Sequence, residues 1–137
     1  MRHIDNDLHQ GISIERKAQL DVLSDYLSQA QELLNMNNVH PAAPAVIIGA
    51  SLEEFLRTWV EEKGLDTDIN KPSIDVYAKI LRESNLITKQ DMKDITSWAG
   101  IRNNAAHGNW DEVKDKLRIK IMLEGVNLFM SRHTSNC

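Results

Sequence analysis

Cysteine is nearly absent from this sequence of 137 residues, since the one that occurs is Cys137, the last residue. A single cysteine cannot form a disulfide within the chain, so the fold must be stable without one, and a reducing compartment suits it. The polar start, residues 1–10, lacks the apolar segment of a signal peptide, and no apolar run reaches the length of a membrane span. We therefore expect a cytoplasmic protein with no membrane segment.

The sequence also lacks a basic excess and a cluster of metal ligands. It has 16 lysine and arginine residues against 20 aspartate and glutamate residues, a net charge of −4, whereas proteins that coat duplex nucleic acid are usually basic. Apart from residue 107, the histidines are scattered without metal-site spacing and are interpreted as surface residues: His3, His9, His40 and His133. We expect no metal and no cofactor.

Regular alternation of apolar and polar positions, the pattern of a half-buried strand, is missing as well. Apolar residues instead recur at spacings of three and four, which predicts helices. Five are expected, at about residues 12–36, 43–63, 73–84, 88–106 and 109–132. No connection is long enough to separate domains. Residues 1–137 should form a single all-α domain, an antiparallel up-and-down bundle of four to five helices with its core at about residues 12–132.

An arginine interrupts the inward stripe of the fourth predicted helix. Arg102 falls in the middle of this stripe, at the same three-and-four spacing as its apolar members Met92, Ile95, Ala99 and Ala106. Burial of an arginine without a partner is unfavourable, so Arg102 should either pair with a carboxylate or line a cleft that takes an anion. The planar guanidinium matches the oxygens of a phosphate, which favours the second role.

A histidine follows at the end of the same helix. The five residues from Arg102 to His107 turn a helix by about 500°, so the two side chains point about 140° apart. They converge if the last turn unwinds at Gly108, or if a second subunit supplies one of them. Hydrogen bonds from Asn103 and Asn104, and the N-terminus of the next helix, would favour an anion at this point.

The fifth predicted helix carries apolar residues on two faces. They form two roughly opposite stripes: Val113, Leu117 and Ile121, and then Ile119, Leu123, Val126 and Met130. One face can pack on the core while the other contacts a partner chain. We expect a homodimer, and the alternative is a central helix within a monomer.

The segment around Arg102 resembles a known family. Arginine before asparagine, four residues between the arginine and His107, and a glycine after the histidine resemble the R-x(4–6)-H motif of HEPN domains. Residues 49–57, Gly-Ala-Ser-Leu-Glu-Glu-Phe-Leu-Arg, are similar to a helix of HEPN proteins related to abortive-infection C-terminal and DUF4145-type domains. The resemblance covers about Ala42 to Met130 and implies a bundle of four or five helices, usually a symmetric dimer.

Many HEPN domains are metal-independent ribonucleases, and the resemblance implies this activity here. His107 would act as acid or base, Arg102 would stabilise the charged phosphoryl transition state, and Asn103 matches the polar residue common after the arginine. Asn104 would support the site, and candidate substrate contacts are Arg57, Trp110 and Lys114. The expected function is a metal-independent endoribonuclease, in phage defence or a toxin–antitoxin system, that cleaves RNA by attack of the 2′-hydroxyl.

Two alternatives remain open. The first is a non-catalytic HEPN-like module that binds a nucleotide, RNA or a regulatory protein partner, which fits the acidic balance of the chain. The second is a structural dimerisation domain in which Arg102 pairs with Glu53 or Glu54 and His107 caps its helix. Arg57 could likewise pair with Glu53, four residues earlier on one helix surface.

Overall fold

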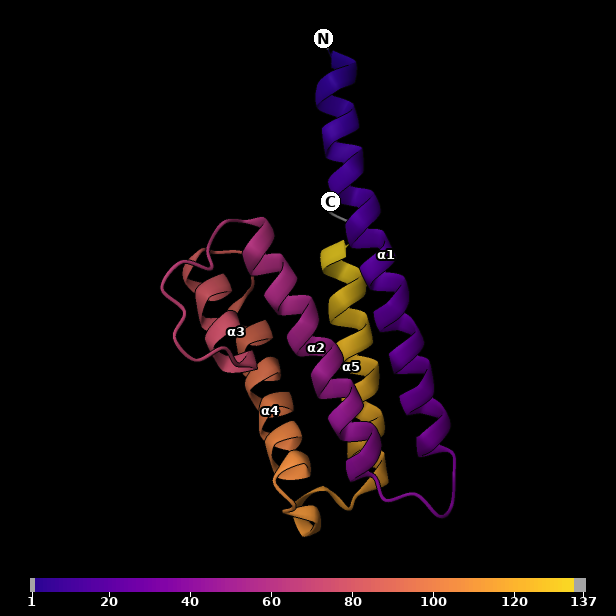
Figure 1. The fold of residues 1–137 in the computed structure, drawn as a ribbon. Coiled ribbons are helices and arrows are strands. Elements are labelled where there is room, and N and C mark those ends of the chain that lie inside the picture. Colours follow the sequence, from indigo (N-terminus) through magenta and orange to yellow (C-terminus); the bar gives the residue numbers. More distant parts are fainter. Residues whose placement is uncertain (1, 135–137) are drawn as a thin grey trace.

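The computed structural model describes the backbone of residues 2–134 and the side chains of residues 14–134. This part of the chain is all-helical and contains no strand, which confirms the predicted fold class. The helices form a bundle in which the long members alternate in direction (Figure 1). Their bounds are α1 Arg2–Leu34, α2 Ala42–Glu62, α3 Ile74–Glu83, α4 Lys89–Ala106, the short 3₁₀ helix η1 Trp110–Val113, and α5 Lys116–Thr134.

Helix α2 is the centre of the bundle, because it contacts α1, α3, α4 and α5. Its inward face is apolar and buried over its whole length, including Ile48, Leu52, Phe55 and Leu56. Complete burial of such a side chain stabilises a fold by about 1.5–3 kcal/mol. Phe55 also meets Phe129 of α5 edge-on, with ring centroids 6.0 Å apart. This packing joins α5 to the centre of the bundle.

The start of α4 is tied to the end of α5 by one carboxylate. A capping box begins α4, because Thr88 Oγ1 accepts from the Asp91 N–H at 3.0 Å and Asp91 Oδ2 accepts from the Thr88 N–H at 3.1 Å. The second oxygen of Asp91 accepts from Arg132 Nη2 at 3.2 Å. Asp91 therefore fixes both where α4 begins and where the last turns of α5 lie.

Two helix boundaries differ from the prediction. The first helix begins at Arg2 rather than near residue 12, and this early part extends beyond the neighbouring helices (Figure 1). The predicted fifth helix is divided, since η1 follows the turn at Gly108 and α5 begins only at Lys116. The reason is Asp115, whose Oδ1 accepts from the Leu117 N–H at 3.0 Å and so begins a new helix there.

The predicted two-faced character of the last helix is only partly seen. Its stripe of Ile119, Leu123, Val126 and Met130 is buried. Of the other predicted stripe, Val113 is buried in η1, whereas Leu117 and Ile121 are 63% and 59% exposed. Leu128, 60% exposed, extends this outward apolar row. The row faces away from the core of the single chain.

Within the described residues, no helix is long and apolar enough to cross a membrane.

The side chain of Arg102 on α4 packs directly against Gly49 of α2. A Cβ atom at this position would lie 2.2 Å from Cγ and 2.6 Å from Cβ of Arg102, which is far inside van der Waals contact. Position 49 therefore requires glycine, because the aliphatic part of the Arg102 side chain occupies the space that a Cβ atom would take. Gly100, on the outer side of α4, has no atom within 4 Å of an added Cβ.

The substitutions Gly49→Ala and Gly100→Ala make a matched pair. Alanine at position 100 should stabilise the protein by about 0.4–1 kcal/mol, because it favours the helix and meets nothing. Alanine at position 49 should destabilise it by about 1–3 kcal/mol, because the stem of Arg102 must move. Urea unfolding measures both free energies, and equal stabilisation by the two variants would contradict the close approach.

Candidate functional site

Arg102 lies on the inward arc of α4, as the stripe predicted, with its guanidinium at the edge of the bundle. Its neighbours Ile95, Ala99 and Ala105 are buried, and its own side chain is half-buried. Nη1 donates to Asn103 Oδ1 at 3.3 Å, while Nε is buried without a hydrogen-bond partner. A donor left unsatisfied in this way is unfavourable in a native fold and indicates a group that an acceptor would stabilise.

One residue of the predicted stripe lies differently from expectation, because Ala106 is exposed. Met92 is half-buried and packs against the core, as the stripe predicted. In the last turn of α4, Ala105 belongs to the core, and its carbonyl accepts from Trp110 Nε1 at 3.2 Å.

A small cleft opens beside Arg102 where α2, α3 and α4 meet. It is about 30 Å³, which is room for about one water molecule. Its lining includes two carboxylates and the N-cap of α3: Glu53, Ser73, Ile74, Asp75, Ala99, Arg102 and Asn103. The cleft itself is too small for a phosphodiester, so an anion must approach the guanidinium from its open side.

The proposed structural pairing of Arg102 with Glu53 or Glu54 is not formed. No carboxylate among residues 14–134 lies within 4.0 Å of the Arg102 guanidinium. Glu54 instead pairs with Arg57 on the surface of α2. The aliphatic part of the Arg102 side chain is therefore packed against α2, and among the described residues its guanidinium has no carboxylate partner that would compete with an anionic ligand.

His107 forms the C-cap of α4, and its side chain is exposed. Its N–H still donates to the Asn103 carbonyl at 3.0 Å, so the helical hydrogen bonds continue to His107. The chain turns only at Gly108, whose φ of +80° suits a residue without a side chain. Unwinding therefore does not bring His107 to Arg102, and within one chain the two side chains stay apart.

The asparagines between them have different roles. Asn103 is exposed and lies on the cleft with Arg102. Asn104 instead stabilises the turn after α4, because its carbonyl accepts from the Asn109 N–H at 2.9 Å and its Oδ1 accepts from Asn109 Nδ2 at 3.3 Å. Only Asn103 is placed to contact a ligand of Arg102.

The three candidate substrate contacts do not form one group. Arg57 is held by carboxylates, with Nε 3.0 Å from Glu54 Oε2 and Nη1 2.6 Å from Glu61 Oε2. These hydrogen bonds raise the pKa of Arg57 and lower that of Glu54. Trp110 and Lys114 are exposed at the other end of α2, where α4 ends. The structure thus favours Trp110 and Lys114 over Arg57 as contacts near His107.

The sequence interpretation missed a second buried arginine. Arg16 is 4% exposed, forms an ion pair with Glu62 of α2, and lies 4.9 Å from the centroid of the Phe55 ring. It interrupts the stripe of α1 as Arg102 interrupts that of α4, because Arg16 lies four residues before Leu20, on the same face of the helix. The same pattern could have identified it.

His133 is not the surface residue that the sequence suggested. Its ring lies between Trp59 and Phe129, with centroid distances of 4.8 and 4.6 Å. Burial lowers the pKa of His133, while Asp91 acts in the opposite direction. The residue belongs to the core where α2, α4 and α5 meet, so it is not a candidate for surface chemistry.

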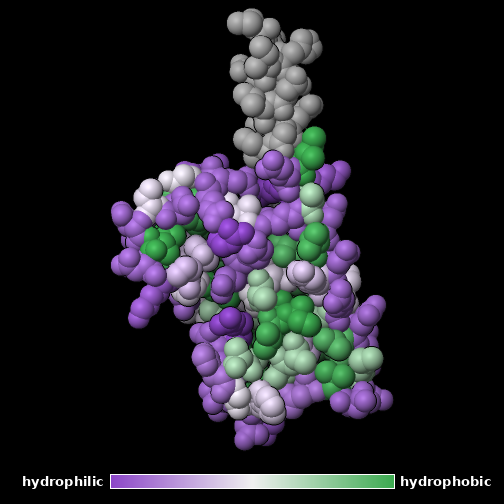
Figure 2. All heavy atoms as spheres, viewed as in Figure 1, coloured by the Kyte–Doolittle hydropathy of each residue, from purple (hydrophilic) through white to green (hydrophobic). Residues whose placement is uncertain are grey.

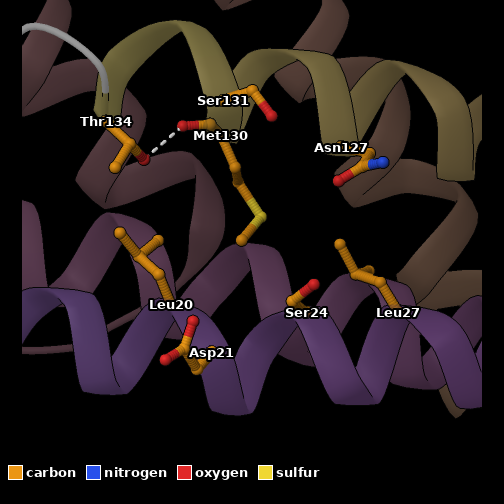
Figure 3. Close-up of a pocket in the computed structure, with 8 residues that line it drawn as sticks. All are labelled: Leu20, Asp21, Ser24, Leu27, Asn127, Met130, Ser131 and Thr134. Carbon is orange, nitrogen blue, oxygen red and sulfur yellow. Dashed lines mark hydrogen bonds between the residues drawn. The ribbon is translucent and has the colours of Figure 1, made fainter.

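A larger groove lies between α1 and α5, away from Arg102. It measures about 370 Å³, and Figure 3 shows Met130 reaching across it between the two helices. Its lining is mixed: Leu20, Asp21, Ser24, Leu27, Asn127, Met130, Ser131 and Thr134. The one charged residue of this lining, Asp21, is acidic, so the groove does not suit a phosphate. The described residues also contain no group of three or more side chains that could hold a metal ion.

No family model matches the chain, and neither a curated protein nor a solved structure gives a match.

Arg16 and Arg102 should respond differently to removal. Arg16→Ala should lower the free energy of unfolding by about 2 kcal/mol, because it removes a buried side chain that packs on the Phe55 ring and pairs with Glu62. Arg102→Ala should lower it by about 1 kcal/mol, because only the packing of the stem is lost. Urea unfolding of both variants tests this, and a larger loss for Arg102→Ala would show that its charge is structural.

Proposed function

We propose that this protein is a HEPN-like, metal-independent endoribonuclease that acts as a homodimer. The observation that carries the proposal is Arg102, a half-buried arginine with no carboxylate partner and an unsatisfied Nε. A free guanidinium at the edge of a packed helix is suited to bind a phosphate through paired hydrogen bonds. The exposed His107 at the end of the same helix supplies a group that can transfer protons near neutral pH.

The proposed reaction uses a nucleophile that RNA itself carries. The 2′-oxygen attacks the adjacent phosphorus, a new O–P bond forms, and the bond to the 5′-oxygen of the next nucleotide breaks. The 2′-hydroxyl loses its proton and the departing 5′-oxygen gains one; the histidine carries out one of these transfers and water the other, while the arginine stabilises the negative charge that develops on the phosphoryl oxygens. The products are a 2′,3′-cyclic phosphate and a 5′-hydroxyl.

Two chains are needed because one chain separates the groups. The hydrogen bond from the His107 N–H to Asn103 keeps α4 regular, so Arg102 and His107 differ in direction by about 140°. In a dimer with two-fold symmetry, each cleft can contain the arginine of one chain and the histidine of the other. Dimerisation would therefore bring together the two groups that the proposed reaction needs.

The first half of α2 is the surface that best fits this dimer. Its residues beside Gly49, where Arg102 packs, are small or apolar: Ala43 and Ala50 are exposed, and Val46 and Ile47 are partly buried against the core. Figure 2 shows apolar side chains gathering on this face over the lower halves of α1 and α2. The second half of α2 is charged there, with Glu54, Arg57 and Glu61. A partner seated on the apolar half would lie next to Arg102.

The exposed row on α5 is a weaker choice for this interface. Leu117, Ile121 and Leu128 lie on the side of α5 opposite its buried stripe. Helix α5 packs mainly against α1 and α2 rather than against α4, the helix that carries Arg102 and His107. A dimer through this row would bury a face of α5 rather than the surface next to Arg102.

A second candidate is a non-catalytic module that binds RNA, a nucleotide or a regulatory protein. The acidic residues Glu53 and Asp75 beside Arg102 favour it, because they oppose the approach of a phosphate. Under either function we propose a cytoplasmic protein of a phage-defence or toxin–antitoxin system, on the HEPN resemblance alone.

The ribonuclease proposal predicts that His107→Ala loses cleavage of a mixed single-stranded RNA by at least about 100-fold in the absence of metal. Arg102→Ala should lose a similar amount, because the charge at phosphorus is then unopposed. Arg118→Ala, a change of an exposed arginine on α5, should cleave like the parent. Gel analysis with EDTA present measures the rates, and circular dichroism shows that the variants are folded.

Equal cleavage by His107→Ala and the parent would contradict the catalytic role. Retained RNA binding without cleavage in the parent would support the non-catalytic module instead.

The dimer proposal predicts opposite results for two glutamate substitutions. Ala50→Glu should convert the dimer to a monomer, because Ala50 is exposed in the single chain and a charge there would be buried at the two-fold interface. Leu128→Glu, at the exposed row of α5, should leave the dimer intact. Sedimentation at micromolar concentration measures the mass of each variant. A parent protein that is monomeric, or a dimer that only Leu128→Glu disrupts, would overturn this interface.

A further inference from the structure

Trp110 is an exposed aromatic residue at the corner between α4 and η1. Its side chain is 56% exposed, whereas Trp59 is 7% exposed and belongs to the core. An exposed indole presents a flat aromatic surface on which a base or another ring can stack. The corner lies at the end of the bundle where α4 finishes and α5 begins (Figure 1).

The Trp110 ring is held in place although it is exposed. Its Nε1 donates to the Ala105 carbonyl at 3.2 Å, so the polar atom of the indole is already satisfied. The His40 ring lies against it, with centroids 5.8 Å apart and a tilt of 40°. His40 is itself fixed, because its Nδ1 accepts from the Ala42 N–H at 3.0 Å. What remains available is the aromatic surface, which needs no hydrogen bond.

The charges around Trp110 are divided. Asp111 and Glu112 follow it directly and are exposed, while Lys114 and Lys116 come next along the chain. Lys116 Nζ donates to the Met36 carbonyl at 3.1 Å, which holds its charge near this end of the bundle. A phosphate backbone would therefore run on the lysine side. His107 lies three residues before Trp110 and is exposed at the same corner.

We propose that Trp110 is a stacking platform for one unpaired base of an RNA whose phosphate reaches His107. The inference rests on the proposed function for the position of the phosphate, and it adds that the substrate is single-stranded. A base offers a flat π surface to an indole and needs no particular donor or acceptor, so the platform accepts any base. A base inside a duplex is already stacked on both sides and cannot reach the ring.

The test measures binding without cleavage. The probe is a fluorescein-labelled 2′-O-methyl RNA of six nucleotides, which lacks the attacking hydroxyl. Fluorescence anisotropy compares the parent with Trp110→Ala, Trp110→Phe and the control Leu117→Ala, which removes an equally exposed apolar side chain from α5. Trp110→Ala should weaken binding roughly tenfold, Trp110→Phe should retain most of the affinity, and Leu117→Ala should bind like the parent.

A second set of probes identifies the stacked base. One abasic site is moved along the six positions, and a loss of affinity at one position in the parent should disappear in Trp110→Ala. The same sequence as a duplex should bind more weakly than the single strand. Parent-like affinity of Trp110→Ala, no position-dependent loss, or preference for the duplex would overturn the platform and assign Trp110 to packing or to a protein contact.

This result is separable from the proposed catalytic function. If His107→Ala cleaves like the parent while the abasic effect depends on Trp110, the ribonuclease assignment fails and the platform stands. If His107→Ala is inactive while Trp110→Ala binds like the parent, the platform fails and the ribonuclease stands.

Discussion

The contact between the stem of Arg102 and the bare backbone of Gly49 is the constraint on which the candidate site depends. Helices α2 and α4 come so close there that a methyl group on α2 would overlap the arginine. The stem is thereby fixed against the central helix, and the guanidinium can only point toward the edge of the bundle. A flexible surface arginine would lose side-chain entropy on binding a ligand, and this one has already lost most of it.

The regularity of α4 has a consequence for assembly. Because the hydrogen bonds of the helix continue to His107, this histidine is directed to a different side from Arg102. A site that uses both groups must therefore be shared between chains. In the proposed dimer, the first half of α2 is the better contact surface. It is apolar and lies next to Arg102, whereas the second half carries surface ion pairs.

The two buried arginines show how similar patterns lead to different outcomes. Arg16 and Arg102 both interrupt an apolar stripe, but Arg16 meets Glu62 and the face of Phe55, whereas Arg102 meets a glycine and an amide. The first is neutralised within the fold and is a structural residue. Both keep buried donors without a hydrogen-bond partner, but only Arg102 has no carboxylate paired with it among the described residues, and this difference makes it the functional candidate.

The sequence by itself determined where most helices lie and that Arg102 is unusual, because both depend on residues three and four apart along one helix. It did not separate η1 from α5, because the start of α5 depends on the hydrogen bond that Asp115 Oδ1 accepts from the Leu117 N–H. Only the tertiary structure decided that Arg16 pairs with Glu62, that His133 lies among aromatic rings, and that Trp110 is held against His40. The partner of a charge or a ring depends on which helices become neighbours, and residues far apart in the sequence do not reveal this.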